Sequence, residues 1–341
     1  VWADWVDNNS GAEIHYRNVP SATCGGGGAA LTDMNGDGKS DLLYRNTATG
    51  QVWRMTMNGF AITGAGMVYH EPNTAWKIIA DADFNGDLVS DLLWRNSSNG
   101  QIYMMTFNSS GVPSGGQVIY TEPNAAWKIV HTPDLNGDGK ADLLWWNSST
   151  GQVYGMLMNG FTIGTQGMIF TEPNTSWRIE VVGDFAGSGK VNQLLWRNII
   201  TGQTWMTTVT VSGGAFSQTG QYFYSSTVPY RMIAAADFNG DGRQDLLWRK
   251  DDTGQVYMML MNGASITTEG QVYHEANTNW KIVAAGDYDG NGKADILWRN
   301  DTTGQIYMML MNGMSIASQA LVYTEGNTAW KVLGPWEYRV P

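Results

Sequence analysis

Cysteine is almost absent from this chain, because Cys24 is the only one among 341 residues. A single cysteine forms no internal disulfide, and no neighbouring motif indicates a catalytic thiol. Basic residues are also scarce, with 20 Lys and Arg against 31 Asp and Glu and a net charge of −11. Since no basic stripe is present to neutralise phosphates, nucleic acid is excluded as a partner.

Long apolar runs are missing as well. No run approaches the roughly 18 residues that a membrane span needs, so the sequence predicts a soluble chain with no membrane span. The chain begins at Val1 rather than Met. We therefore expect a processed or trimmed chain.

Glycine, aromatic residues and methionine are abundant instead. The 42 Gly, 16 Trp, 15 Tyr and 18 Met suit many short strands joined by tight turns, with broad aromatic packing. Hydrophobic residues make up 43% of the chain, which is enough for a large core. An all-β repeat fold of this length can be one unit. We therefore expect a single domain over residues 1–341.

An acidic loop at residues 237–245 reads DFNGDGRQD. Oxygen-bearing side chains occupy its first, third, fifth and ninth positions, and its glycines allow a tight curl. This spacing suits a hard cation. An EF-hand begins in a similar way but needs a Glu at position twelve, where this chain has Trp248. Because Trp248 lies in an apolar run typical of a buried strand, we expect the loop to hold its cation within a β-hairpin.

The acidic loop recurs with a fixed period. Its copies start at residues 33, 83, 134, 184, 237 and 287, which places them 50 to 53 residues apart. Each period also contains four short β-type runs bounded by Gly, Asn, Asp and Thr turns. Repeats of this length with four strands are typical of propeller blades.

Neither end of the chain is a complete repeat. Residues 1–25 contain a weak copy of the second and third runs, and residues 326–341 contain another first run. Joined, they make about one repeat, with Glu337 and Asp4 at positions one and nine of a split loop. The sequence therefore predicts an all-β, seven-bladed β-propeller of four-stranded blades, closed by pairing of the N- and C-terminal strands. Such closure leaves no long unpaired edge.

Five of the six loops keep oxygen side chains at all four positions, and position seven would offer its main-chain carbonyl. Loop by loop, the candidate ligands are Asp33, Asn35, Asp37, Lys39 and Asp41; Asp83, Asn85, Asp87, Val89 and Asp91; Asp134, Asn136, Asp138, Lys140 and Asp142; Asp237, Asn239, Asp241, Arg243 and Asp245; and Asp287, Asp289, Asn291, Lys293 and Asp295. The alternative is that these are only Asx-rich turns, but five copies with the same positions filled favour a cation site.

The remaining loop, at Asp184, has lost this pattern. Ala186, Ser188 and Asn192 leave it one carboxylate, so we expect it to keep the hairpin shape without an ion. Oxygen-only ligation in the other loops favours Ca²⁺, and about five structural calcium ions would bring the net charge of −11 close to zero. Because such sites usually bind at extracellular calcium levels, we expect a secreted protein.

The DxNGDGxxD loop followed by an LLW strand, repeated across nearly the whole chain, resembles the FG-GAP/VCBS repeat of integrin-α-like β-propellers. This resemblance implies a calcium-binding propeller. In plan, the chain is also similar to seven-bladed calcium-binding propeller lectins of fungi.

A second repeated feature is expected on the face opposite the calcium loops, next to an Arg-Asn pair at a strand end. It combines a carboxylate, an amide and an aromatic ring: Glu71, Asn73 and Trp76; Glu122, Asn124 and Trp127; Glu172, Asn174 and Trp177; Glu275, Asn277 and Trp280; and Glu325, Asn327 and Trp330. Such a set suits a sugar, because polar groups take hydroxyls and the ring takes the C–H patch. The alternative is structural: the tryptophans fill the wedge between blades, Glu pairs with Arg95 or its counterparts, and Pro-Asn forms a turn.

Other repeated residues are expected in the core. They are the mid-strand tryptophans Trp94, Trp145, Trp196, Trp248 and Trp298, and methionine runs such as Met258, Met259 and Met261.

Three functions then compete. The leading prediction is a secreted, calcium-stabilised lectin that binds glycans or glycoproteins, because a ring of similar weak sites gives avidity. The alternative is a protein-interaction or adhesion module of the integrin-head type, with a protein partner bound at one blade-specific surface, for which residues 209–230 are the candidate. The third is a polysaccharide-active enzyme. Since no residue pair sets one site apart, as acid/base catalysis requires, we expect no enzymatic activity.

Overall fold

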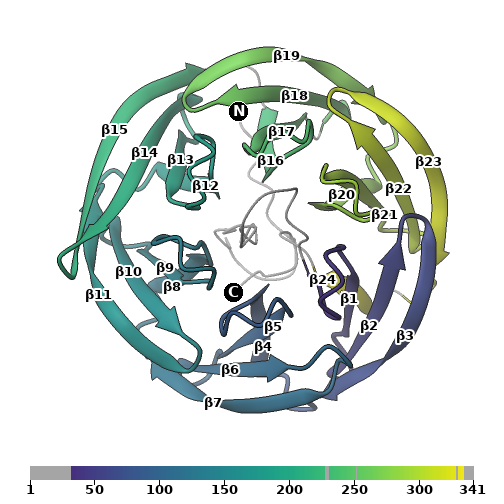
Figure 1. Ribbon diagram of the computed structural model, residues 1–341, viewed down its shortest axis with the longest axis horizontal. Coiled ribbons are helices and arrows are strands. Elements are labelled where there is room, and N and C mark those ends of the chain that lie inside the picture. Colours follow the sequence, from purple (N-terminus) through teal and green to yellow (C-terminus); the bar gives the residue numbers. More distant parts are fainter. Residues whose placement is uncertain (1–31, 227–229, 251, 328, 334–341) are drawn as a thin grey trace.

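The computed structural model describes residues 32–226, 230–250, 252–327 and 329–333. Within these residues the chain forms twenty-four β-strands, arranged as six antiparallel four-stranded sheets around a central axis (Figure 1). A ring of such sheets is a β-propeller, in which each sheet is one blade. In the same residues, no helix is long and apolar enough to cross a membrane.

The blades are numbered here in chain order, and each is given from its innermost to its outermost strand. Blade 1 consists of β24 (Trp330–Leu333), β1 (Leu42–Asn46), β2 (Gln51–Asn58) and β3 (Ala61–His70); blade 2 of β4 (Trp76–Ala82), β5 (Asp91–Asn96), β6 (Gln101–Phe107) and β7 (Pro113–Thr121); and blade 3 of β8 (Trp127–His131), β9 (Leu143–Asn147), β10 (Gln152–Asn159) and β11 (Thr162–Thr171). Blade 4 consists of β12 (Trp177–Gly183), β13 (Gln193–Asn198), β14 (Gln203–Ser212) and β15 (Ala215–Ser225); blade 5 of β16 (Tyr230–Ala236), β17 (Asp245–Lys250), β18 (Gln255–Asn262) and β19 (Ser265–His274); and blade 6 of β20 (Trp280–Gly286), β21 (Asp295–Asn300), β22 (Gln305–Asn312) and β23 (Ser315–Thr324).

The prediction of seven blades was wrong, because the described strands make six. β24 pairs with β1, with Leu333 opposite Leu43 and Trp330 opposite Asn46. The C-terminal run is therefore the innermost strand of the repeat whose acidic loop starts at Asp33, and assigning it to a separate repeat added one blade. Residues 1–25, which were assigned to the split blade, lie outside the described residues, as does Glu337.

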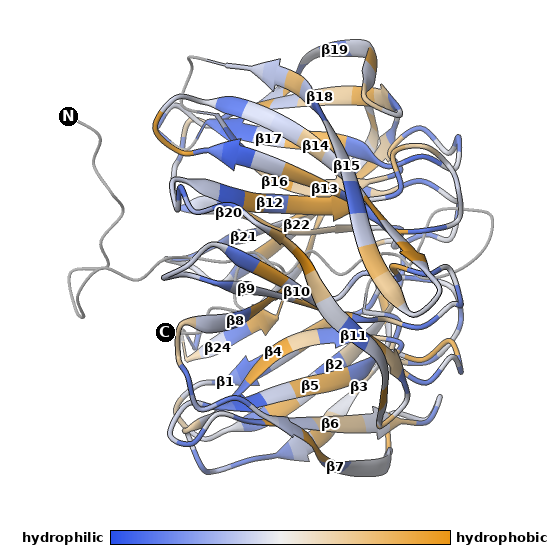
Figure 2. Ribbon diagram, turned by 90° about the vertical axis from the view of Figure 1, so that its left-hand side faces the viewer, coloured by the Kyte–Doolittle hydropathy of each residue, from blue (hydrophilic) through white to orange (hydrophobic). Residues whose placement is uncertain are grey.

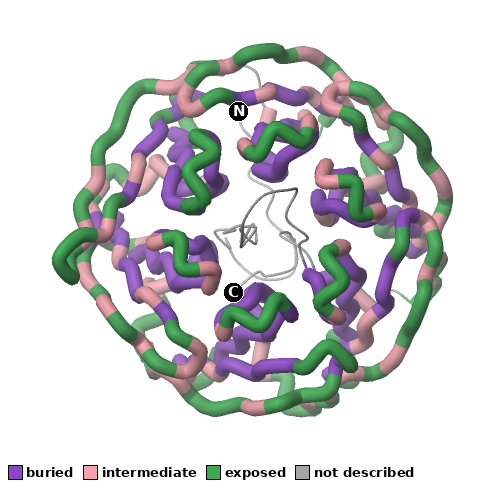
Figure 3. Tube along the Cα trace, in the orientation of Figure 1, coloured by how far each residue is buried: buried purple, intermediate pink, exposed green. Residues whose placement is uncertain are grey.

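The hydrophobic core is divided into six clusters, and each lies between two neighbouring blades. The cluster that closes the ring joins Tyr44 and Val332 of blade 1 to Tyr288 and Met308 of blade 6. The outermost strands are the more exposed ones (Figure 3), and most hydrophilic residues lie toward the turns (Figure 2). Because each blade buries both of its faces against neighbours, the fold depends on a closed ring.

The residues predicted for the core are buried. None of the five mid-strand tryptophans is more than 4% exposed, and the methionines of β18 are 0 to 3% exposed. These rings and thioethers fill the space between the blades, which confirms the prediction that they are packing residues.

The connections between strands define two faces. The loop face carries the six acidic loops that start at residues 33, 83, 134, 184, 237 and 287, together with the turns between the third and fourth strands. The N–H of Gly59 in such a turn donates to the carbonyl of Tyr288 in an acidic loop at 2.8 Å. The linker face carries the Glu-Asn-Trp segments and the turns between second and third strands, where the N–H of Glu71 donates to the carbonyl of Gly50 at 3.0 Å.

Candidate functional site

The first aspartate of each well-formed acidic loop organises the main chain around it. Asp237 accepts the N–H of Gly240 on Oδ1 at 2.7 Å and the N–H of Gly242 on Oδ2 at 2.8 Å. These glycines have φ angles of 79° and 81°, in the left-handed region that favours glycine. The loop at Asp83 reaches the same shape with Leu88 at φ 68°, so that leucine is held in a strained conformation.

The ninth aspartate ties the loop to a strand of its own blade. Asp245 accepts the N–H of Phe238 on Oδ2 at 3.1 Å and the N–H of Met261 on Oδ1 at 2.9 Å. The equivalent residues make the same pair of bonds and are all buried, namely Asp41, Asp91, Asp142 and Asp295.

The position of the ninth aspartates has an electrostatic cost. Burial raises the pKa of these carboxyl groups more than the two accepted N–H bonds lower it, and the charges of neighbouring aspartates raise it further. The pKa of Asp91 and Asp142 is thereby raised to about 8. By the same causes, the pKa of Asp41, Asp245 and Asp295 is raised to about 7. A bound cation would offset this repulsion and keep these carboxylates ionised.

The donor set of the loop at Asp287 fits a divalent cation. Carboxylate oxygens of Asp287, Asp289 and Asp295 lie within 4.8 Å of one another, a separation that a cation with 2.3–2.6 Å bonds to oxygen can bridge. In the other four loops, the first and ninth aspartates are likewise buried while the fifth is exposed. The oxygen-only composition suits Ca²⁺, and occupation of these sites stays a prediction.

The six loops are joined in a closed ring, a feature that sequence reasoning missed. The eighth residue of each loop donates its main-chain N–H to the carbonyl of the first aspartate in the preceding blade. Ser90 donates to Asp33 at 2.7 Å, and Ser40 donates to Asp287 at 2.7 Å, which closes blade 1 onto blade 6. The other four bonds run from Ala141 to Asp83, Val191 to Asp134, Gln244 to Asp184 and Ala294 to Asp237. An ion bound in one loop would therefore also stabilise the contact between two blades.

The seventh residue of each loop has a packing role. The side chain of Lys293 lies 3.3 Å from the point where a Cβ on Gly240 would stand, and Lys39 lies 3.0 Å from the equivalent point at Gly290. Its alkyl stem thus covers the glycine turn of the neighbouring loop. The repeated Lys or Arg at this position is the signal that could have indicated the contact.

The loop at Asp184 keeps the hairpin shape that we expected. Asp184 accepts the N–H groups of Ser188 at 2.8 Å and Gly189 at 2.6 Å. Asn192, at position nine, donates its side-chain amide to the carbonyl of Val209 at 2.8 Å. An amide that donates here takes the place of the carboxylate that accepts in the other blades.

On the linker face, the predicted Glu and Asn residues are used in their own turns. Glu275 Oε1 accepts the N–H of Asn277 at 2.8 Å, and Asn277 Oδ1 accepts the N–H of Asn279 at 3.1 Å. The other four sets make the same two bonds. Trp280 packs edge to face on Tyr307 of its own blade with ring centroids 6.1 Å apart, and it packs against the core cluster between blades 5 and 6. Turn formation by the Glu and Asn residues and packing of the Trp residues between blades account for the repetition of these sets. Sugar contact stays a prediction.

The arginine beside these sets fastens one blade to the next. Arg45 donates to the main-chain carbonyl of Trp76 at 2.7 Å, and its guanidinium lies 4.9 Å from the centroid of Trp94. Arg95 and Arg299 make the equivalent bonds to the carbonyls of the next blade's first residue. Arg95 also donates to the main-chain carbonyl of Glu122 at 3.1 Å, so its contact with that residue is to the backbone.

Comparison with known proteins identifies the repeats. The model of the FG-GAP-like repeat matches residues 33–94, 83–145 and 237–298, which together make slightly more than half of the chain. The chain belongs to the FG-GAP-like repeat family. All three matches begin at the first aspartate of an acidic loop, so the FG-GAP unit here includes the loops described above. No curated protein matches the sequence.

Three solved structures with a similar fold are distant in sequence from this FG-GAP chain. The pore structure of the Photorhabdus luminescens Tc holotoxin matches with a TM-score of 0.52 and 15% identity over 87% of this chain and 16% of that chain. The nidogen/laminin complex matches with a TM-score of 0.49 and 13% identity, over 82% of this chain and 92% of that chain. The periplasmic gluconolactonase PpgL of Pseudomonas aeruginosa matches with a TM-score of 0.48 and 12% identity, over 84% of this chain and 85% of that chain.

The prediction that the chain is not an enzyme requires correction. It rested on the lack of a residue pair that sets one site apart, yet gluconolactonases are among the solved structures that the chain matches. A fold by itself neither excludes nor assigns a catalytic function.

Proposed function

We propose that this FG-GAP propeller is an extracellular, calcium-stabilised protein-interaction module whose partner binds blade 4. The five acidic loops would hold Ca²⁺ through the ligands named above and keep the ring closed. Extracellular location follows from the calcium concentration that such loops usually need. The observation that supports the partner surface is that blade 4 carries more exposed large apolar side chains than any other blade in the described residues.

Blade 4 carries four of these side chains. Ile199 and Ile200 are 47% and 69% exposed in the turn between β13 and β14, and Trp205 and Tyr222 are 40% and 55% exposed on a directly paired position of β14 and β15. Clusters of exposed apolar residues mark interaction sites. Aromatic side chains of this kind are enriched in protein interfaces.

The two turn isoleucines of this surface are specific to blade 4, whereas exposed apolar residues on the outermost strand, such as Met67 and Leu321, also occur in other blades. The turn positions of Ile199 and Ile200 are Thr47 and Ala48 in blade 1, and Ser148 and Ser149 in blade 3. The hairpin of β14 and β15 is the longest described, with strands of 10 and 11 residues. The acidic loop of blade 4 also keeps only one carboxylate, Asp184. One divergent blade among regular ones is what a single protein partner would require.

The substitution Ile200→Asp tests the partner surface. It should weaken partner binding by at least about tenfold, because it puts a charge into a desolvated contact. The matched control is Ser149→Asp in the same turn of blade 3. Surface-immobilised wild type and both variants are compared for capture of extracellular proteins, after their melting temperatures are shown to agree. A captured set that is the same for all three proteins would refute the blade 4 surface.

Glycan binding by the Glu-Asn-Trp sets is the second candidate. The supporting observation is that all five sets place a half-buried Glu, an exposed Asn and a half-buried Trp on the linker face. Such repetition would give avidity on a multivalent glycan. A glycan array probed in the presence of calcium should then show binding that Trp280→Ala weakens, and a blank array would reject this candidate.

A further inference from the structure

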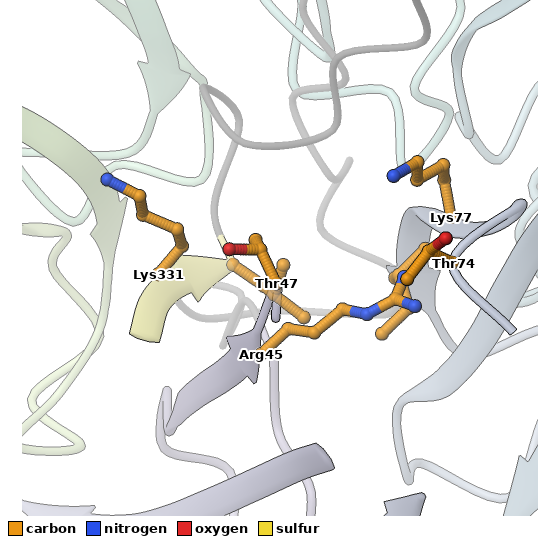
Figure 4. A pocket seen from close by; sticks show the side chains of 7 residues that line it. Arg45, Thr47, Thr74, Lys77 and Lys331 are labelled. Carbon is orange, nitrogen blue, oxygen red and sulfur yellow. The ribbon is translucent and has the colours of Figure 1, made fainter. Parts of the chain in front are cut away.

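A small cavity opens on the linker face between blades 1 and 2 (Figure 4). Its volume is about 60 Å³, and it is lined by Arg45, Thr47, Thr74, Lys77, Ile78, Lys331 and Leu333. Three of these side chains are cationic and none is acidic. In a chain with a net charge of −11, such a concentration of positive charge calls for a specific reason.

Three different strands supply the cations. Arg45 on β1 is 6% exposed, and its position is fixed by the bond to the carbonyl of Trp76 and by the ring of Trp94. Lys331 on β24 and Lys77 on β4 are half-buried. Figure 4 shows the two lysine side chains on either side of Arg45, with the amine of Lys77 above its guanidinium. The arginine thus forms a rigid floor and the lysines form the walls.

Arg45 and Lys77 repel each other within the cavity. The pKa of Lys77 is lowered by burial and by the charge of Arg45. Glu71 acts on Arg45 from outside the cavity lining, and its Oε1 is occupied by the N–H of Asn73 at 2.8 Å. An anion within the cavity would therefore relieve the repulsion between Arg45 and Lys77, which the carboxylate of Glu71 leaves in place.

The other junctions of the ring lack the full set. Trp146 replaces the arginine between blades 3 and 4, and Ala125 replaces Thr74 between blades 2 and 3. Thr47 is replaced by Ile199 between blades 4 and 5 and by Asp251 between blades 5 and 6. Between blades 6 and 1, the position of Thr47 is Asp301, whose carboxylate lies 3.6 Å from the guanidinium of Arg299. The arginine of that junction therefore has a carboxylate, Asp301, as its counter-ion. At the junction of blades 1 and 2, the uncharged Thr47 stands at the same position.

We infer that this cavity is an oxyanion site, which takes the sulfate or phosphate group of an anionic ligand. The ammonium group of Lys77, the hydroxyl of Thr74 and the N–H groups of Arg45 that do not face Trp76 are its donors, and Lys331 adds positive charge to the lining. The hydroxyl of Thr47 donates to the carbonyl of Ala329 at 3.2 Å and shapes the wall. The site is separate from the calcium loops, which lie on the opposite face, and from the apolar surface of blade 4.

Inorganic sulfate is the probe, because it coexists with millimolar calcium. Isothermal titration of sodium sulfate is compared with sodium chloride at matched ionic strength. Wild type should bind sulfate, and Lys77→Gln and Thr47→Asp should each weaken that binding by at least about tenfold, since each removes a cation or adds an anion at the site. Lys281→Gln, at the junction where Asp301 already neutralises the arginine, should bind sulfate as wild type does.

Folding of the variants is checked in chloride by their melting temperatures. Thr47→Asp copies the residue that blade 6 already carries, so it should fold as wild type does. Sulfate that binds no better than chloride would overturn the proposal. So would equal sulfate affinity in wild type, Lys77→Gln and Thr47→Asp, because the ion would then bind elsewhere.

Discussion

Chelation of calcium by EDTA is expected to lower the melting temperature of this protein by on the order of 10 °C. Each ion that binds only the folded state adds about 1.4 kcal/mol when free calcium exceeds its dissociation constant tenfold, so five sites add about 7 kcal/mol. Because hydrogen bonds join successive loops around the ring, removal of the ions should lower the stability of the whole ring and not of single loops. Differential scanning calorimetry in calcium and in EDTA measures it.

The degenerate loop provides the matched control. Asp237→Asn should reduce the difference between the melting temperatures in calcium and in EDTA, because it removes a ligand charge from a complete set. Asp184→Asn should leave that difference unchanged, since its loop has already lost the other carboxylates. An equal melting temperature with and without calcium in the wild type would rule out structural calcium.

The pH dependence in EDTA has a defined sign. The five ninth-position aspartates have a folded-state pKa of about 7 or 8, raised from 3.8. Between those values the folded state binds more protons than the unfolded state, so the free energy of unfolding falls as the pH rises. The melting temperature in EDTA should therefore decrease from pH 5 to pH 8, and saturating calcium should remove most of this decrease. An increase over that range in EDTA would contradict the raised pKa values.

A chain that ends at residue 329 is expected to lose its cooperative unfolding transition at physiological temperature. It lacks β24, and with it Val332 and Leu333, which are 2% and 6% exposed. Their burial contributes about 1.5–3 kcal/mol each, and the loss of β24 also leaves the edge of β1 unpaired. Circular dichroism and calorimetry of the truncated chain measure the result.

Complementation distinguishes loss of this strand from general damage. A peptide of residues 326–341 added to the truncated chain should restore the transition, because it can pair with β1. A peptide of the same composition in scrambled order should have no effect. If the truncated chain melted as the full chain does, β24 would have no role in closing the ring.

Much of the fold follows from local patterns that repeat. The alternation of apolar and polar residues and the turn residues predict the strands. The buried tryptophan in five of the six second strands, such as Trp248, is recognisable as core from its apolar neighbours. The acidic loops were found in the sequence because their positions are set by local geometry: Gly240 and Gly242 permit the curl that brings their N–H groups to Asp237.

The number of blades could not be derived in the same way. The run Trp330–Leu333 has the pattern of every other first strand, so its composition does not identify its partner. Only the pairing with β1 decides that it completes blade 1. The ring of bonds such as Ser40 to Asp287 was also beyond sequence reasoning, because it joins main-chain groups in different repeats.

For the linker face, the sequence identified the residues but left their role open. A Glu, an Asn and a Trp in a repeated segment fit a sugar site and a turn equally well. The bonds of Glu275 and Asn277 to main-chain N–H groups favour the turn, because an oxygen already used in this way is less available to a hydroxyl. The cavity at Arg45 was missed because it forms between blades, from residues at opposite ends of the chain.

The calcium content of the protein tests the central claim most directly. Equilibrium dialysis followed by metal analysis should find about five calcium ions per chain, one for each complete loop. Asp295→Asn should reduce the content by about one ion, and Asp184→Asn should leave it unchanged. A wild-type chain that retains no calcium at millimolar concentration would contradict the account, as would an ion in the loop at Asp184.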